Sequence, residues 1–380
     1  MTPGLLEKIK ALIKDGAIVV GTPPLKSPSL VNYPKCDNIV RSTAENIWGS
    51  LKTPATIQMR SYGKGKIYWG GPLSQHAASE LYPNYDATSG LLKKINVAED
   101  FESTASLRYT HRKTNDLDIY FVSNKTDQTL TADCLFNIKE GVPELWDPIK
   151  GETRPLFDFT RTKGRTAIPL TFASYQSFFV VFNKKTRPVS PKAAGAENFP
   201  KKEVAYTIEN AWDVSFDSKW GGPAKVTFEK LEDWTKRPEK GIKYYSGIAT
   251  YRTTFELSES KHSKHYISLG EVNCMARVRI NGKDLGIVWT SPWQIEITDA
   301  VKQGTNKLEI DVANLWVNRL IGDEQFPDDG IKDGKWPEWL LEGKPRTSGR
   351  FTFCTHKFYN ADSPLQKSGL IGPVKILKVL

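Results

Sequence analysis

The sequence predicts a multidomain, mainly β protein that begins with a short α/β segment. Its length of 380 residues exceeds that of one ordinary domain. The hydrophobic period changes from helical to alternating near residue 99, and a Pro- and Lys-rich stretch follows residue 184. We therefore expect a partial α/β domain at 1–98, an antiparallel β-sandwich at 99–186, a linker at 187–202 and a jelly-roll β-sandwich at 203–380.

The first segment has clear start and stop signals. Thr2 and Pro3 form an N-cap and a first helical residue, and Asp15-Gly16 ends that helix. The apolar stretch 17–20 and the stretch 66–69 are typical of strands buried on both faces, with a second helix between them. Two strands are too few for a stable parallel sheet. The segment is therefore interpreted as the second half of a domain.

The remainder alternates with period two. Asn281-Gly282 is a strong hairpin signal, because both central residues of a type I′ turn need positive φ. Leu308, Ile310 and Val312 alternate with acidic residues, which indicates one buried and one solvated face. The expected strands are 118–122, 132–138, 165–170, 178–182, 251–257, 276–280, 308–312 and 371–380.

Composition and charge exclude several classes of protein. The chain is 39% hydrophobic and 25% charged, as in soluble globular proteins, and its longest apolar run, 178–182, is too short for a membrane span. The net charge of +10 is spread among acidic neighbours without an Arg-rich arm or recognition helix. We expect neither a nucleic-acid nor a membrane partner.

The cysteines and the N-terminus carry little functional signal. The four cysteines, at 36, 134, 274 and 354, form no C-x-x-C pair, so neither a zinc site nor a redox dithiol is predicted. Buried free thiols are the default interpretation, and one disulfide stays open. Glu7, Lys8 and Lys10 interrupt any early apolar stretch, so we expect no signal peptide in this chain.

Motifs for catalysis are absent from the sequence. There is no nucleophile elbow, no H-E-x-x-H, no phosphate loop and no dinucleotide fingerprint. Asp323, Glu324, Asp328 and Asp329 could supply hard oxygen ligands to calcium, although a solvated loop explains them better. No cofactor is required by the sequence, and no metal ligand is assigned.

Tryptophan is the unusual feature. Eight of the 11 tryptophans follow residue 205. Indole faces stack on the apolar face of a pyranose, whereas large aromatic residues also fill sandwich cores, and for a single tryptophan the core is the default. The core interpretation is weaker for four that stand in or beside loops with prolines and charges: Trp289, Trp293, Trp336 and Trp339.

Several runs resemble known glycoside hydrolases. The run 244–251, together with 269–272, 278–283 and 286–289, resembles the sugar-binding domain of the β-galactosidase and β-glucuronidase family. The runs 314–323 and 368–374 resemble the version of this domain that ends large bacterial α-L-rhamnosidases. Upstream, 21–30 and 63–66 resemble the glutamine-amidotransferase-like middle domain of that family, and 143–148 resembles its following β domain.

The resemblance implies a function but not a catalytic residue. In that family the catalytic carboxylates lie on an N-terminal (β/α)₈ barrel, which needs roughly 250 residues, and only 98 precede the β regions here. The resemblance also implies a periplasmic or extracellular parent enzyme, an upstream catalytic barrel as partner and an oligosaccharide or polysaccharide ligand.

Three hypotheses follow. The first is an accessory, carbohydrate-binding portion of a glycoside hydrolase, with contacts from Trp289, Trp293, Asn314, Trp316, Asn318 and Arg319. Asn314 could equally end a strand and cap a turn, and Arg319 could equally form a buried ion pair. The alternative is a self-sufficient glycosidase of rhamnose-containing glycans, with acids among Asp311, Asp323, Asp328 and Glu338. The third is a protein-interaction module.

Overall fold

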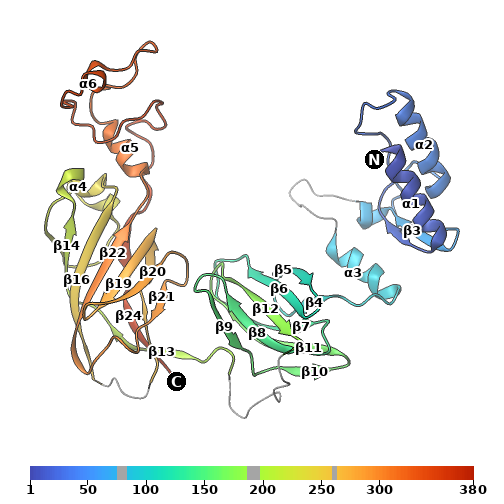
Figure 1. Cartoon of the computed structure of the whole chain (residues 1–380), viewed down its shortest axis with the longest axis horizontal. Helices are drawn as coiled ribbons and strands as arrows, with labels where there is room; N and C mark the ends of the chain where they lie inside the picture. Colours follow the sequence, from blue (N-terminus) through green and yellow to red (C-terminus); the bar gives the residue numbers. More distant parts are fainter. Residues whose placement is uncertain (75–83, 186–196, 259–262) are drawn as a thin grey trace. The chain divides into compact units, whose positions relative to one another are not determined.

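The computed structural model describes residues 1–74, 84–185, 197–258 and 263–380 (Figure 1). The chain forms two compact units, Met1–Glu102 and Ser103–Leu380, which are described separately. Most of the expected linker at 187–202 lies outside the described residues, and Lys202 already belongs to a strand. Within the described residues, no helix is long and apolar enough to cross a membrane.

The first unit is an α/β segment with two helices against a small sheet. The Thr2 hydroxyl accepts a hydrogen bond from the Leu5 N–H and starts α1, as the sequence predicts, and Gly16 ends α1 at φ 122°. Strand β1 is parallel to β3, and β2 is antiparallel to β3. The elements are α1 (Pro3–Asp15), β1 (Ile18–Val20), α2 (Lys35–Trp48), β2 (Gln58–Tyr62), β3 (Gly65–Trp69) and α3 (Tyr85–Lys94).

One prediction about this unit is wrong. Strands β1 and β3 were both expected to be buried on both faces. However, Ile18 and Val20 are 43% and 41% exposed, and on β3 Lys66 is exposed and Tyr68 is only partly buried. Helices α1 and α2 pack on the face that carries Ile67, where Leu6 and Ile13 are fully buried. Because the side chains of a strand alternate, Ile18 and Val20 lie on the opposite face, which no described element covers.

The middle sandwich contains every strand that the sequence predicts for it. Its two sheets have the orders β10-β11-β7-β4 and β5-β6-β12-β8-β9. Rings of Tyr120, Phe136 and Phe182 meet edge to face in its core. The strands are β4 (Phe101–Ser103), β5 (Leu107–Lys113), β6 (Leu117–Asn124), β7 (Leu130–Phe136), β8 (Val142–Asp147), β9 (Glu152–Pro155), β10 (Thr160–Thr162), β11 (Arg165–Phe172) and β12 (Ser177–Asn183).

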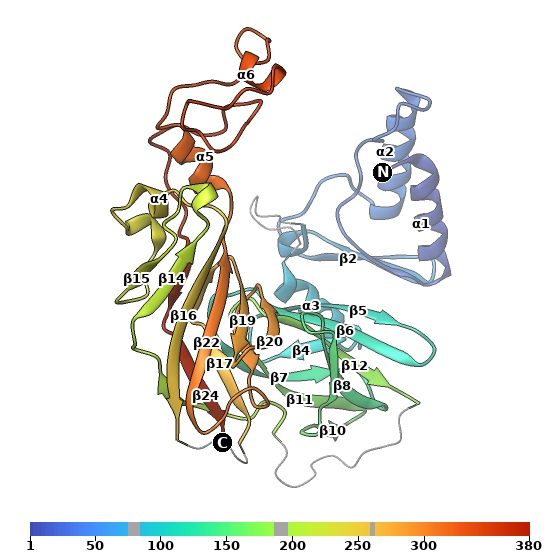
Figure 2. The ribbon, with the colours of Figure 1, turned by 60° about the vertical axis from the view of Figure 1, so that its left-hand side comes forward.

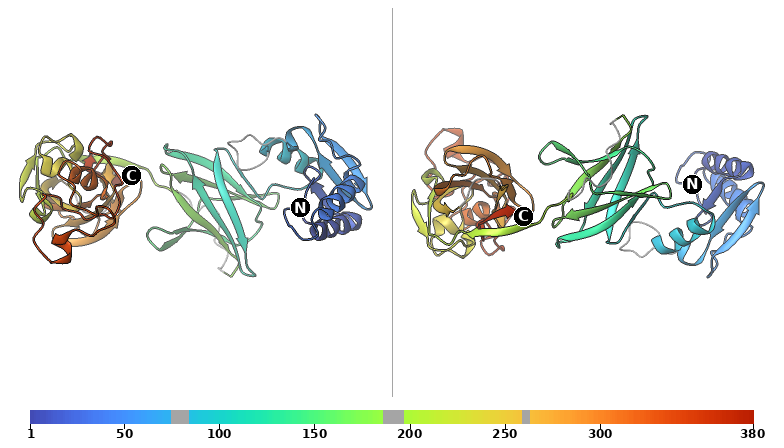
Figure 3. Two further views of the ribbon diagram at one scale, coloured as in Figure 1. Left: turned by 90° about the horizontal axis from the view of Figure 1, so that it is seen from above. Right: turned by 90° about the horizontal axis from the view of Figure 1, so that it is seen from below.

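The C-terminal sandwich is the second β domain. A six-stranded sheet of order β15-β14-β16-β22-β19-β20 faces a four-stranded sheet of order β13-β24-β17-β21, and Figure 3 shows their strands nearly end-on. A short pair, β18-β23, completes it. The strands are β13 (Lys202–Thr207), β14 (Trp212–Phe216), β15 (Val226–Phe228), β16 (Ile248–Leu257), β17 (His265–Ser268), β18 (Glu271–Asn273), β19 (Met275–Ile280), β20 (Lys283–Val288), β21 (Gln294–Glu296), β22 (Gly304–Ala313), β23 (Gly369–Gly372) and β24 (Lys375–Val379).

Two sequence predictions for this sandwich have different outcomes. The Asn281-Gly282 hairpin between β19 and β20 is confirmed, with φ of 53° and 84° at the two residues. The single strand expected at 371–380 is instead two strands, β23 and β24, with Pro373 between them. Proline has no N–H to donate to a ladder, so the chain leaves one sheet there and enters the other.

Aromatic residues fill the core of the C-terminal sandwich. Trp212, Trp234 and Tyr251 are at most 1% exposed, and the Trp234 indole donates to the Tyr251 hydroxyl at 2.5 Å. Burial raises the pKa of Tyr251, so its hydroxyl stays protonated and can serve as a structural group. The core interpretation therefore holds for these tryptophans.

The four cysteines are free thiols. Cys36 and Cys134 are buried, and Cys274 and Cys354 are partly buried. Burial raises the pKa of Cys134 to about 12, which makes its thiol unreactive. The default interpretation of the sequence is confirmed for the first two cysteines.

Candidate functional site

The candidate residues gather at one end of the C-terminal sandwich. Strands β20 and β22 both run antiparallel to β19, so their C-terminal ends lie at the same end of the six-stranded sheet. Helix α5 (Val317–Asp323) follows β22 directly, and the long segment that contains α6 (Glu338–Leu341) extends beyond it (Figure 2). This end therefore brings Trp289, Asn314 and the residues of α5 into one region.

Exposed apolar side chains form a patch at this end. Strand register places Ala313 opposite both Ile248 and Met275, and Val288 opposite Ala276. Ala276 and Val288 are buried, and side chains alternate along a strand. Their chain neighbours Met275 and Trp289 therefore face outward. We define the rim patch as the six side chains that are 44–59% exposed here: Ile248, Met275, Ile287, Trp289, Leu315 and Trp316.

The three predicted tryptophans differ in accessibility. Trp289 and Trp316 are 54% and 48% exposed, so each presents part of its indole to solvent. Trp316 meets the ring of Trp220 edge to face at 5.2 Å, which fixes its orientation. Trp293, at φ 53°, is instead partly buried against the sandwich core.

The two predicted asparagines hold the junction of β22 and α5 together. The Asn314 amide donates to the Tyr245 carbonyl at 2.8 Å and to the Ser368 hydroxyl at 3.1 Å. The Asn318 amide donates to the Gln366 carbonyl at 2.6 Å and to the same hydroxyl at 3.0 Å. Both side-chain oxygens accept backbone N–H groups. These amides therefore position the chain around the site, and any direct contact with a ligand stays a prediction.

Arg319 is buried beneath the same end. It is 3% exposed, donates from Nη2 to the Trp220 carbonyl at 2.7 Å and lies 4.3 Å above the Phe351 ring. Burial lowers the pKa of its guanidinium, and Nε has no partner among the described residues. The Arg319 cation is thus held by a carbonyl and a ring. From the sequence, an ion pair and a ligand contact were equally expected.

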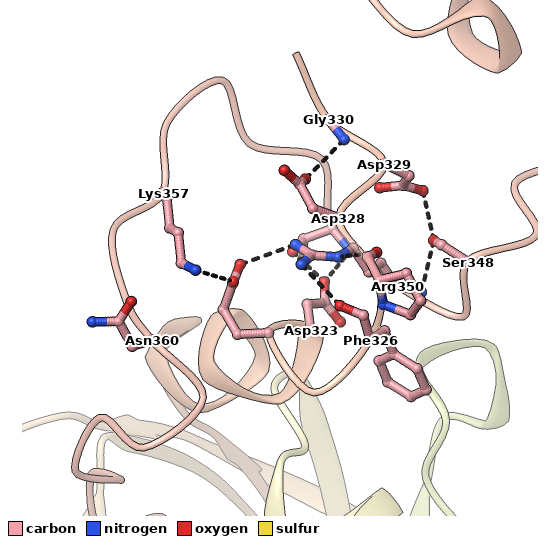
Figure 4. A network of polar contacts seen from close by, with 12 residues as sticks. Asp323, Phe326, Asp328, Asp329, Gly330, Ser348, Arg350, Lys357 and Asn360 are labelled. Atoms are coloured by element: carbon pink, nitrogen blue, oxygen red, sulfur yellow. Dashed lines mark hydrogen bonds and ion pairs between the residues drawn. The ribbon is translucent and has the colours of Figure 1, made fainter. Parts of the chain in front are cut away.

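The acid-rich loop is organised by cations and amides of its own chain (Figure 4). Asp323 accepts from the N–H groups of Phe351 and Thr352 and from the Thr352 hydroxyl. Glu324 pairs with Arg350 and Lys357, and Asp329 pairs with Arg346. No group of three or more potential metal ligands is found among the described residues. Calcium stays a prediction.

The acids named for a self-sufficient glycosidase are dispersed over different elements. Asp311 lies on β22 and accepts from Thr250 at 2.8 Å and from Arg279 at 2.7 Å. Asp323 ends α5 with both oxygens hydrogen-bonded, and Glu338 begins the short helix α6. A retaining or inverting glycosidase needs a facing pair of carboxyl groups. Asp311 and Asp323 already bind donors of their own chain.

The aliphatic part of the rim patch and Trp220 were not predicted from the sequence. Met275 precedes Arg277 and Arg279, whose positions two and four residues later mark the outer face of β19. Ile248 similarly shares a face with Thr250 and Arg252. On a half-buried strand, an apolar residue at the same alternating positions as the polar residues indicates an exposed apolar side chain. This pattern could have predicted the patch.

Family comparisons agree with the sequence motifs. The family model of α-L-rhamnosidase matches residues 1–161, and a model described as a glycosyl hydrolase 2 galactose-binding domain-like region matches residues 234–349. The second match covers most of the six-stranded sheet, α5 and the rim patch. The resemblance to α-L-rhamnosidases with a galactose-binding-like domain is confirmed, as is the mainly β, multidomain fold.

Individual relatives are much longer than this chain. A rhamnosidase structure from Novosphingobium sp. PP1Y is 29% identical with a TM-score of 0.70, over 98% of this chain and 32% of that one. A protein of Formosa agariphila that carries the provisional name β-glucuronidase is 40% identical over 202 residues, 49% of this chain and 17% of its own length. The chain thus spans a third or less of both relatives.

Proposed function

We propose that this chain is an accessory, carbohydrate-binding portion of a rhamnosidase-like glycoside hydrolase, and that it binds rhamnose-containing glycans at the rim patch. The observation that carries this proposal is the pair of half-exposed indoles, Trp289 and Trp316, at one end of a galactose-binding-like sandwich. An indole stacks on the apolar face of a sugar ring, and its N–H can donate to a hydroxyl. A rim of this kind suits recognition of an extended saccharide.

The buried residues beneath the rim support the exposed ones. Asn314 and Asn318 fix the end of β22 and the start of α5, between which Leu315 and Trp316 stand. Arg319 fixes the Trp220 carbonyl, and the Trp220 ring in turn packs on Trp316. A binding surface needs side chains whose conformations are held before the ligand arrives, since ordering them on binding costs affinity.

Binding of rhamnose-containing oligosaccharides by the purified chain tests the proposal. Trp289→Ala and Trp316→Ala should each weaken binding about tenfold or more, as loss of one stacked aromatic contact costs on the order of 1–3 kcal/mol. Tyr175→Ala is the control, because Tyr175 is an aromatic residue that is 65% exposed and lies between β11 and β12 of the middle sandwich, outside the rim patch and the segment 324–368. Unchanged affinity in both variants would show that the rim patch does not bind the saccharide.

The alternative is catalysis by the chain itself. It would need a carboxylate pair among acids such as Asp311, Asp323, Asp328 and Glu338. Turnover of an aryl α-L-rhamnoside that a single carboxylate-to-amide change abolishes would establish it. The carbohydrate-binding proposal predicts no such turnover.

A further inference from the structure

The segment between α5 and β23 encloses a cavity whose lining contains no residue of the rim patch. The cavity has a volume of about 140 Å³ and lies between the loop after α5 and the irregular stretch 350–359. A protein cavity of about 150 Å³ can hold a benzene ring, so the space suits one six-membered ring rather than a longer chain. Its lining includes Asp328, Phe353, Lys357, Phe358 and Tyr359.

The walls of this cavity are held by partly buried ion pairs rather than by regular secondary structure. Arg346 binds the Asp329 carboxylate through two nitrogens at 2.6 Å each, and both side chains are under 20% exposed. Arg350 binds Glu324 at 2.9 Å and the Phe326 carbonyl at 3.1 Å (Figure 4). Bidentate and charge-assisted contacts of this kind fix geometry strongly. The cavity is therefore preformed.

The polar groups left over on its lining suit hydroxyl recognition. Among the described residues, Asp328 accepts one hydrogen bond, from the Gly330 N–H at 3.0 Å, so its second carboxylate oxygen is open to a ligand there. The Tyr359 hydroxyl can both donate and accept. A carboxylate with an adjacent phenol binds neighbouring hydroxyl groups well.

Aromatic rings complete the lining. Phe353 packs against Trp336 and Trp339 at 5.8 Å each, which fixes its ring. Phe358 is 65% exposed and meets His356 edge to face. Aromatic faces beside hydroxyl-binding groups are the combination that a pyranose requires, since the ring has an apolar face and a polar edge.

The charges of the lining select the kind of sugar. Four carboxylates, Asp323, Glu324, Asp328 and Asp329, face three cations, Arg346, Arg350 and Lys357. Both arginines are occupied by carboxylates and carbonyls of the chain. Among these seven groups one negative charge is in excess, which disfavours an anionic ligand.

We infer that this cavity is a second sugar-binding site, which takes one neutral pyranose ring through Asp328, Tyr359 and the aromatic lining. The inference rests on the proposed carbohydrate-binding function but uses residues separate from the rim patch. A glycan could then occupy the cavity with one residue while another part stacks on the rim.

Calorimetric titration of the full chain with neutral methyl pyranosides, including the α-L-rhamnoside, tests the inference, with D-glucuronate as the anionic comparison. Asp328→Ala should weaken the neutral sugar about tenfold or more, and Tyr359→Phe several-fold, because each removes a hydrogen bond to the ligand. Glu338→Gln is the matched control, since it removes a negative charge from the same segment outside the cavity lining. Circular dichroism checks that each variant folds.

The outcomes separate the two proposals. Loss of monosaccharide binding in the cavity variants, with wild-type affinity in Trp289→Ala, supports the cavity. Wild-type affinity in both cavity variants, with loss in the rim variants, overturns the cavity and leaves the proposed function standing. Glucuronate that binds as tightly as the neutral sugars overturns the charge selection. If no saccharide of any length binds, both proposals fail.

Discussion

Two parts of the C-terminal domain use the same residue types in opposite ways. In the two-sheet core, Trp212, Trp234 and Tyr251 are buried, and apolar contact holds the structure together. In the segment 324–368, Trp336 is 48% exposed and Asp329–Arg346 and Glu324–Arg350 pairs hold the chain. Packing thus stabilises the core, whereas the segment keeps aromatic and polar groups accessible at the surface. Long segments of this kind in compact domains are commonly functional.

The largest effect should follow from a change in the core. Trp234→Ala should lower the free energy of unfolding of this domain by about 3–5 kcal/mol, because it leaves a large cavity and removes one of the two donors to the Tyr251 hydroxyl. Trp336→Ala should cost only about 0.5–1.5 kcal/mol, the value of one stacked pair with Phe353. Guanidinium denaturation of both variants measures the difference. Equal losses would contradict the contrast between core and segment.

A pair of glycines isolates the packing around Trp234. Gly369 and Gly286 have similar φ, 99° and 97°, so alanine strains the backbone about equally at each. An added Cβ would lie 2.4 Å from Trp234 Nε1 at Gly369 but in open space at Gly286. Gly369→Ala should therefore be less stable than Gly286→Ala by about 1–3 kcal/mol. Matching melting temperatures for the two variants would show that the core yields more easily than its packing indicates.

A change in the ion pairs should act locally. Asp329→Asn removes the charge that Arg346 and Ser348 contact, and loss of such a bond costs about 1–3 kcal/mol. We expect faster amide hydrogen exchange in 346–352 and unchanged exchange in β16 and β22. If exchange accelerates in the strands as well, the segment and the core unfold together and the comparison fails.

The smallest effect is a pH dependence confined to the segment. Hydrogen bonds from Arg346, then from Ser348, hold the pKa of Asp329 below its usual value. A carboxyl group whose pKa is lowered by folding stabilises the protein above its unfolded pKa, near 4, and this stability is lost as pH falls through the folded pKa. Protection of 346–352 should therefore decrease below about pH 4. Protection that instead rises on acidification would contradict the assignment.

The sequence predicted local elements better than the site. Thr2, Gly16 and Asn281-Gly282 act through short-range backbone preferences, so the ends of α1 and the β19–β20 hairpin were predictable. The exposure of Ile18 and Val20 was not, because it depends on which elements cover the sheet. A strand's sequence does not state how many faces are covered.

The candidate site shows the same limit. Trp289 and Trp293 were predicted as sugar contacts from their loop context, and Trp316 was named with them. Trp289 and Trp316 are half-exposed, whereas Trp293 is partly buried against the core. Asn318 forms its bonds with residues about 50 positions later, at 366 and 368, and such long-range partners are invisible in one sequence. The cavity depends on pairing between Asp329 and Arg346 across an irregular segment, where no periodicity guides prediction.

Isothermal titration calorimetry of the full chain with a rhamnose-containing oligosaccharide decides between binding and hydrolysis, because it records both in one trace. We expect saturable heats that return to baseline after each injection, and weaker binding by Trp289→Ala. A sustained heat signal would mean that the chain hydrolyses the glycan and is itself an enzyme. No heat signal over a range of temperatures would mean that the domain does not bind such glycans.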